Sequence, residues 1–337
     1  MSIVPVDHGL YQITEEESKN SAIFHGSLLL DRAGSIYSVI GIPPPPGNVI
    51  AFKKYHLCND LESIWKRGNR RYCRLVQDYT QYSILTHTLT VMDPRFNTEV
   101  PVISTMNIER TLDPFNGLHR ILTHPEDTLQ YTLIDFLSEI NRETGIRLDS
   151  WGVTGSILAG IHNPDKSDID LILIGEEPSK AVFEYMKKRQ FPRIVNWASI
   201  QSRYEMDPRI LKLISKGRSR FMWKNHKISI IFIEGDIYHP KYCETFHGFL
   251  TWNAIVLKEA KRFKGIVKID SNKGALTYPP CVDTGNYLLM SFDHALAPIL
   301  EESRCLSIDT LSGRTVDGID IVFLGVKERR LTKIKSC

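Results

Sequence analysis

The 337-residue chain lacks the features of membrane, secreted and disordered proteins. It has no run of 18 uncharged apolar residues, which excludes a predicted membrane-spanning helix. Its first residues, MSIVPVDHGLYQITEEE, have neither the basic start nor the apolar stretch of a signal peptide. Hydrophobic residues make up 42% of the chain, which is too many for disorder throughout. We therefore expect a cytoplasmic protein of two or three domains with no membrane partner.

Cysteine is scarce and scattered along the chain. No two cysteines form a CxxC pair, which argues against a zinc knuckle and against a disulfide framework. The pattern favours a reducing compartment, in which we expect the cysteines to be small buried hydrophobic residues. The six cysteines lie at positions 58, 73, 243, 281, 305 and 337.

A large net charge is also missing, since the whole chain carries a formal charge of only +3. Between Lys187 and Lys227, however, twelve lysine and arginine residues stand against two acidic ones, so that this basic block has a charge of about +10. A local block of this kind predicts that one face of the protein meets a polyanion, either a triphosphate or a nucleic-acid backbone. Solvated helix faces are the alternative for many of its residues.

The hydrophobic pattern predicts an α/β (α+β) protein in three parts. Short apolar runs separated by turns indicate three strands between residues 21 and 55, and residues 86–110 are expected to be extended, with the run 66–71 as a loop. We expect an N-terminal β-rich module (1–115), a core with a mixed sheet backed by helices (116–264) and a C-terminal β module (265–337). Helices are predicted over residues 59–85, 126–144, 179–190, 208–216 and 250–264, and a buried strand over 227–233.

Residues 151–175, WGVTGSILAGIHNPDKSDIDLILIG, carry the chemistry. Residues two apart in a strand point to the same side, so Asp168 and Asp170 are expected to project together. Two adjacent carboxylates repel each other, and on a half-buried strand they are costly unless a cation neutralises them. Mg²⁺ or Mn²⁺ prefers such oxygen ligands and also binds phosphates. An acid pair solvated at a turn is the alternative.

Gly155 and Ser156 precede this acid pair by a spacer of eleven residues. Glycine lets another group approach the backbone closely, and the amides and the hydroxyl of a Gly-Ser bend can bind an anion. The bend and the acid pair are therefore interpreted as two halves of one metal–triphosphate site.

This arrangement resembles the nucleotidyltransferase superfamily, which includes DNA polymerase β, poly(A) polymerase, CCA-adding enzymes and aminoglycoside nucleotidyltransferases. The superfamily pattern is an apolar residue, Gly, Gly or Ser, about ten residues, and Asp-apolar-Asp/Glu-apolar. The residues that match it are Thr154-Gly155-Ser156 and Asp168-Ile169-Asp170-Leu171. GSILAGIHNPDKSDIDL, together with GIPPPPGNVIAFKKY nearer the N-terminus, is similar to archaeal predicted nucleotidyltransferases of unassigned substrate.

The resemblance implies a nucleotidyltransferase-type sheet and a two-metal transfer of an NMP from an NTP, such as ATP, to a hydroxyl group. Asp168 and Asp170 would be the catalytic metal ligands for Mg²⁺ or Mn²⁺, and Gly155 and Ser156 would hold the β- and γ-phosphates. The basic block favours a nucleic-acid acceptor, RNA above DNA, over a small molecule. A toxin-like transferase that modifies protein or tRNA is a further alternative.

The superfamily also has a third carboxylate on a later strand, and here the chain departs from the pattern. In KISIIFIEGD (227–236) the expected position is Ser229, which cannot take the role of a carboxylate ligand. Glu234 or Asp236 would substitute if the register differs. Otherwise the first metal is weakly held, and the chain is either a slow transferase or a catalytically degenerate nucleotide- or RNA-binding protein on the same fold.

The segment GRSRFMWKNHK (217–227) groups basic and aromatic residues immediately before that strand. Arginine matches the geometry of phosphate, and aromatic rings stack on bases. We therefore predict phosphate or RNA contacts for Arg218, Arg220 and Lys224. The aromatic residues Phe221 and Trp223 either join those contacts or belong to the core.

Overall fold

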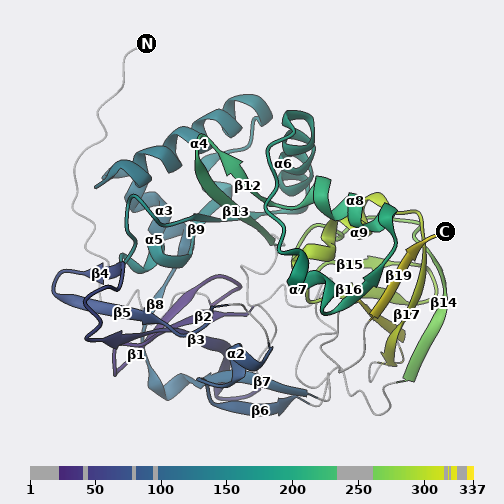
Figure 1. Cartoon of the computed structure of the whole chain (residues 1–337), viewed down its shortest axis with the longest axis horizontal. Coiled ribbons are helices and arrows are strands. Elements are labelled where there is room, and N and C mark those ends of the chain that lie inside the picture. Colours follow the sequence, from purple (N-terminus) through teal and green to yellow (C-terminus); the bar gives the residue numbers. More distant parts are fainter. Residues whose placement is uncertain are drawn as a thin grey trace.

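Three sheets organise the chain in space. The structure is a computed structural model that describes residues 23–40, 45–77, 81–93, 98–233, 261–314, 318, 320–324 and 332–337. Its strands form an eight-stranded, a four-stranded and a seven-stranded sheet, seen at lower left, top and right in Figure 1. The protein is therefore of the mixed α and β class, as predicted. None of the helices in this part of the chain has both the length and the apolar character needed to cross a bilayer.

The eight-stranded sheet confirms the strands predicted near the N-terminus and in residues 86–110. Its main path runs β4-β5-β3-β2-β1-β8, and β6 and β7 extend it from β3. The strands are β1 (Leu28–Asp31), β2 (Ile36–Val39), β3 (Asn48–Cys58), β4 (Trp65–Arg67), β5 (Arg70–Arg74), β6 (Thr90–Asp93), β7 (Thr98–Ser104) and β8 (Ile108–Leu112).

The helix predicted over residues 59–85 is wrong, and so is the loop predicted over 66–71. Strands β4 and β5 form a hairpin there, and only α2 (Gln81–Leu85) is helical. Gly68 and Asn69 make the two-residue turn between the strands, and Gly68 has the positive φ, +56°, that such turns require. The sequence contains these turn residues, but Leu61, Ile64 and Trp65 have the spacing of one helix face and favoured the helix prediction.

The four-stranded sheet is mixed and has helices packed on it. Its order is β12-β13-β10-β9, in which β10 and β13 are parallel and the outer pairs are antiparallel. The ring of Phe136 on α4 lies 5.3 Å from that of Trp223 on β12, so α4 covers the β12 edge. The strands are β9 (Trp151–Val153), β10 (Ile169–Ile174), β12 (Arg220–Trp223) and β13 (His226–Ile233).

The predicted helices of the core are confirmed up to residue 217. Helix α4 begins where the Asp127 carboxylate accepts hydrogen bonds from the Leu129 and Gln130 amides, and it ends at Gly145 with φ +72°. The helices are α3 (Pro114–Thr123), α4 (Thr128–Thr144), α5 (Gly155–Ala159), α6 (Glu176–Arg189), α7 (Trp197–Gln201), α8 (Pro208–Gly217) and α9 (Ala297–Glu302), with 3₁₀ turns η1 (Thr105–Asn107), η2 (Leu148–Ser150) and η5 (His294–Leu296).

The seven-stranded sheet contains the short β runs predicted for the C-terminal part. Its path is β11-β19-β17-β18-β16-β15, and β14 pairs with β17. In its described part, the helix predicted over residues 250–264 is wrong, because residues 261–264 belong to strand β14. The strands are β11 (Tyr204–Met206), β14 (Lys261–Lys268), β15 (Cys281–Asp283), β16 (Leu288–Ser291), β17 (Cys305–Arg314), β18 (Asp320–Leu324) and β19 (Thr332–Ser336).

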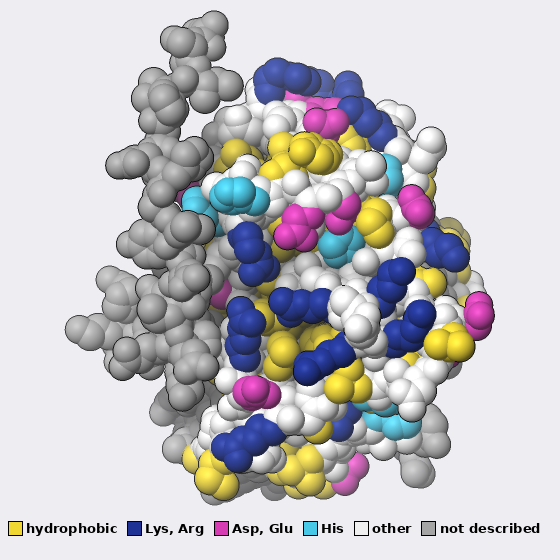
Figure 2. All heavy atoms as spheres, turned by 90° about the vertical axis from the view of Figure 1, so that its left-hand side faces the viewer, with side chains coloured by type: hydrophobic (Ala, Val, Ile, Leu, Met, Phe, Trp, Pro, Cys, Tyr) yellow, Lys and Arg dark blue, Asp and Glu magenta, His cyan; other side chains and the backbone are white. Residues whose placement is uncertain are grey.

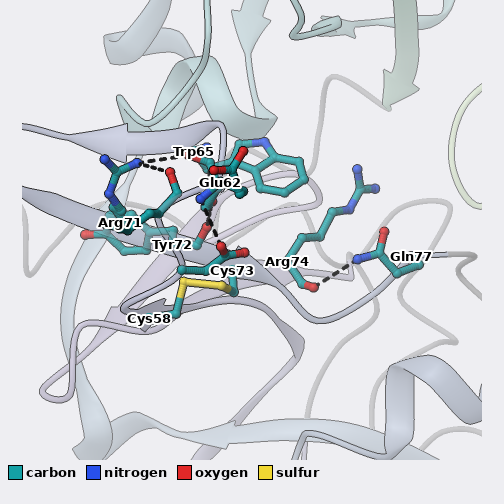
Figure 3. The surroundings of a disulfide bond; sticks show 11 residues. Cys58, Glu62, Trp65, Arg71, Tyr72, Cys73, Arg74 and Gln77 are labelled. Carbon is teal, nitrogen blue, oxygen red and sulfur yellow. Dashed lines mark hydrogen bonds between the residues drawn. A yellow bond between two sulfur atoms is a disulfide. The ribbon is translucent and has the colours of Figure 1, made fainter.

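Two disulfide bonds contradict the expectation that the cysteines are unpaired. Cys58 at the end of β3 is bonded to Cys73 on β5 (Figure 3), and Cys305 on β17 is bonded to Cys337. Among the described cysteines, Cys281 is buried and outside these two disulfides, as predicted, and Cys243 lies outside the described residues. Antiparallel pairing of β3 with β5 brings Cys58 and Cys73 together. The helix predicted over residues 59–85 did not include this pairing, so the disulfide was not expected. The basis for predicting a reducing compartment is thereby removed.

Replacing both Cys58 and Cys73 with serine is expected to lower the free energy of unfolding by about 3 kcal/mol, because the bond closes a 15-residue loop in the unfolded chain. Urea denaturation followed by tryptophan fluorescence measures the change. Dithiothreitol should lower the Tm of the wild type more than that of the variant, which has one bond fewer to lose. A non-reducing digest that releases the two cysteines on separate, unlinked peptides would contradict the pairing.

Candidate functional site

The predicted bend lies directly against the predicted acid pair. Strand β9 leads into α5, and the chain then returns along β10 antiparallel to β9, so that the Thr154 amide donates to the Asp170 carbonyl oxygen at 2.9 Å. Gly155 has φ +67°, and a Cβ added there would overlap the Oδ2 atom of Asp170. No other residue type satisfies both conditions without displacement. Glycine is therefore required at position 155 because the carboxylate occupies the space beside it.

A cavity of about 620 Å³ opens at this point, between the four-stranded sheet and the N-terminal sheet. The volume lies within the range of small-molecule sites. Ser156, Asp168 and Asp170 line it from the core. Across from them, β2, β3 and the β4–β5 hairpin supply the other wall. The cationic side chains among the described lining residues are Lys54, Arg74, Lys166, Arg220 and Lys227.

Asp168 is paired with two of these cations. Its Oδ2 accepts a hydrogen bond from the Arg220 guanidinium at 2.8 Å, and its Oδ1 lies 3.8 Å from the Lys227 ammonium. Two adjacent, partly buried carboxylates are costly unless a cation lies near them. The protein itself supplies such cations, which lowers the electrostatic cost of the pair even before a ligand enters.

Asp170 lines the cavity together with Asp168. Burial raises the pKa of Asp170, and the positive charge of Lys54 on β3 opposes that rise. Asp168 raises the pKa further, whereas Arg220 and Arg74 lower it. The charge state of this carboxylate therefore depends on side chains of the N-terminal sheet as much as on its own strand.

Ser229 stands where the third carboxylate of the resemblance was expected. Parallel pairing of β10 with β13 sets Ser229 directly beside Asp170, and both residues line the cavity. Its hydroxyl adds an uncharged oxygen at that position. Glu234 and Asp236, the predicted substitutes, lie outside the described residues.

Strand β12 separates the basic and aromatic residues of segment 217–227. Phe221 and Trp223 are buried in the core, where both rings contact Phe136. They are therefore not available for stacking on bases, and the core alternative is confirmed for them. Because side chains alternate along a strand, Arg220 points the other way and reaches the cavity.

The other two predicted phosphate contacts are not among the residues that line the cavity. Arg218 at the end of α8 is half-buried, and burial lowers its pKa while the charge of Asp293 in the C-terminal part raises it. Lys224 is exposed at the β12–β13 turn with φ +43°, and its ammonium lies 4.3 Å from the centroid of the Trp223 ring. Of the three, only Arg220 lies near the acid pair.

Sequence reasoning missed the wall that the N-terminal sheet contributes. Lys54 on β3 is only 8% exposed and faces the cavity, and Arg74 on β5 does so as well. Arg74 extends away from the Cys58–Cys73 disulfide beside Trp65 (Figure 3), and its guanidinium carbon lies 6.0 Å from the Trp65 ring centroid. A lysine within the apolar strand VIAFKKY was the available signal, because buried lysine is rare without a function or a partner.

The donor set suits a metal ion that enters together with a phosphate ligand. The described residues contain no cluster of three or more His, Cys, Asp or Glu side chains that could hold an ion alone. Asp168 and Asp170 provide two carboxylates, and Mg²⁺ commonly takes one or two carboxylates and completes its shell with water and substrate phosphates. The residues present therefore fit Mg²⁺ bound jointly with a polyphosphate.

No protein-family model, curated protein or solved structure matches the chain. The chemistry of the site therefore rests on the residues and distances given above.

A stack of rings connects the cavity to the C-terminal sheet. His25 lines the cavity and its ring lies tilted against that of Tyr278 at 4.1 Å between ring centroids, and Tyr278 stacks on His294 at 5.0 Å. Burial lowers the pKa of His25 to about 3, and the nearby His294 contributes to the shift. Burial likewise lowers the pKa of His294 to about 4. Both rings are therefore neutral at physiological pH.

Stability is expected to fall on acidification through this stack. Both folded pKa values lie below 6.5, so from about pH 6.5 down to about pH 4 the unfolded chain binds protons that the folded chain does not, at a cost of up to about 1.4 kcal/mol per pH unit and histidine. His294→Phe keeps a ring against Tyr278 and should flatten the fall of Tm with pH, whereas substitution of the exposed His119 by Gln should not. Equal slopes for wild type and His294→Phe would contradict the assignment.

Proposed function

We propose that the chain is a Mg²⁺-dependent nucleotidyltransferase that moves an NMP from an NTP to a hydroxyl acceptor. One observation carries the proposal: Asp168 and Asp170 line the same cavity as Ser156 of the bend, together with five lysine and arginine side chains. A carboxylate pair alone would suit a metal, and cations alone would suit an anion. The combination suits a metal–polyphosphate.

The fold is compatible with the proposal but does not carry it. The resemblance implies a mixed sheet backed by helices, and the β12-β13-β10-β9 sheet is mixed and has α4 and α6 packed on it. Because unrelated functions share folds, the support for the proposed function comes from the residues of the site and not from the fold.

The residues of the chain would divide the work as follows. Lys54, Arg74 and Lys227 would neutralise the triphosphate, and the Ser156 hydroxyl would donate to a phosphate oxygen. Asp168 and Asp170 would hold Mg²⁺, with Arg220 turning from Asp168 to the phosphates. When bound, the ion would supply charge neutralisation and a lower pKa for the attacking hydroxyl. The acceptor oxygen bonds to the α-phosphorus, the bond to the bridging oxygen breaks, pyrophosphate leaves and the hydroxyl proton passes to water.

A second function, nucleotide or RNA binding without transfer, is favoured by one observation. Ser229 occupies the position beside Asp170, where a third carboxylate would complete the ligand set. In this alternative the cavity binds a metal–nucleotide, and no pyrophosphate is released.

Pyrophosphate release from NTPs in the presence of mixed RNA and Mg²⁺ tests the transferase. Asp168→Asn/Asp170→Asn is expected to reduce the rate by about two orders of magnitude or more, because the ion loses both carboxylate ligands. Asp165→Asn is the matched control, since this exposed aspartate lies in the same loop but does not line the cavity. If wild type and the double variant give the same background, the transferase proposal fails.

Ser229→Asp separates a slow enzyme from a binding protein. A carboxylate beside Asp170 would complete the ligand set, so that the rate in Mn²⁺ is expected to rise about tenfold or more if the wild type is a slow transferase. Ser229→Asn is the matched control, because it has similar size and no charge. Tighter Mn²⁺–nucleotide binding by Ser229→Asp than by the wild type, with no pyrophosphate release from either protein, would favour the binding protein.

A further inference from the structure

The β4–β5 hairpin has one face that runs from the cavity to the tip of the hairpin. Trp65 pairs with Tyr72 and Arg67 pairs with Arg70, so these residues share a face with Arg74. Trp65 and Arg74 line the cavity at the inner end of this face. Arg67 and Arg70 are exposed at its outer end.

The outer end of the hairpin holds like charges directly opposite one another. Arg67 faces Arg70 across the strands, and Lys66 faces Arg71. Such pairs destabilise a hairpin. Within the described ranges, no acidic side chain forms an ion pair with Lys66, Arg67 or Arg70. The repulsion is therefore offset by other contacts of the hairpin, including the disulfide that joins β5 to β3.

The hairpin is also held in place against the core. The Lys66 amide donates to the Ile161 carbonyl oxygen at 3.0 Å, immediately after α5. Arg67 lies over Gly160, where an added Cβ would be 3.9 Å from its Nε atom. The cationic tip thus has a set position relative to the bend that begins at Gly155. Figure 2 views the molecule from the side on which β4 lies in Figure 1, and it shows lysine and arginine side chains gathered on this face.

We propose that the outer end of the hairpin binds the single-stranded end of a nucleic acid, the acceptor of the transfer proposed above. Arg67 and Arg70, on the face shared with Trp65, would contact successive phosphates, and the terminal nucleotide would approach the cavity beside Trp65. A narrow row of cations that leads to an aromatic ring is the pattern that binds single strands, whose exposed bases can stack. The inference rests on the proposed function for the identity of the ligand as acceptor, and it moves the predicted acceptor contact away from the basic block 187–227.

Fluorescence anisotropy with labelled single-stranded RNA, single-stranded DNA of the same sequence and the corresponding duplex tests the proposal, without metal or NTP. Arg67→Gln/Arg70→Gln is expected to raise the Kd for the single strand about tenfold and to reduce the slope of log K against log salt by about 1.4, for two lost phosphate contacts. A preference for RNA or for DNA identifies the acceptor, and either preference supports the proposal.

The control removes three exposed charges from the basic block instead, one more than the hairpin variant loses. Arg209, Lys212 and Lys216 lie on α8, beside the C-terminal sheet in Figure 1. Replacing these three with glutamine should leave Kd within about twofold if the hairpin is the site. The proposal is overturned if the α8 variant loses as much affinity as the hairpin variant, if neither loses any, or if the duplex binds as tightly as the single strand.

Two further measurements keep folding and catalysis apart from acceptor binding. Arg67→Lys/Arg70→Lys keeps the charge and should bind the single strand with a Kd within about twofold of that of the wild type. The glutamine variant should have a Tm no lower than that of the wild type, because the repulsion between like charges is removed. A lower Tm together with weak binding by the lysine variant would overturn the proposal. Pyrophosphate release is assayed separately, so that loss of transferase activity with intact hairpin-dependent binding is distinguished from failure of the acceptor surface.

Discussion

The charge balance around Asp168 and Asp170 is the constraint on which the rest of the cavity depends. Asp168 immediately precedes β10 and Asp170 lies on it, and the two carboxylates are tolerated because cations from separate parts of the chain act on them. Arg220 and Lys227 come from the core sheet, whereas Lys54 and Arg74 come from the N-terminal sheet. The N-terminal sheet is therefore part of the site, since without it Asp170 would lose two of its nearby positive charges.

Much of the fold followed from periodicity and turn chemistry. Helix α4 was predicted to within two residues of its start, together with the glycine that ends it, because a long amphipathic helix has a strong signal. The β4–β5 hairpin was missed because strands of three and five residues are too short to show alternation, and because Leu61, Ile64 and Trp65 have the spacing of one helix face. The Cys58–Cys73 disulfide depends on the position of β5 in that hairpin, so it was not predicted either.

One part of the candidate site could likewise be predicted from the sequence, and the other part could not. Gly155, Ser156, Asp168 and Asp170 could be predicted to lie together because one short segment contains them all and strand geometry relates them. The parallel pairing of β10 with β13 also places Ser229 beside Asp170, where the motif pattern expected a carboxylate. The opposite wall could not be predicted, because it depends on how a sheet about a hundred residues earlier in the chain packs against the core. Long-range packing of this kind has no local signature in one sequence.

The short strand β11 has a consequence for how this chain can be divided. It lies between α7 and α8 along the chain, yet it pairs in parallel with β19 at the edge of the C-terminal sheet. A recombination event or an engineered cut near residue 264 would remove β19 and leave the backbone of residues 204–206 without its neighbour. The C-terminal sheet is thus not a cassette that could be exchanged between proteins by joining ends at one point. An exchange that keeps the sheet whole would have to carry residues 204–206 together with the strands after residue 260.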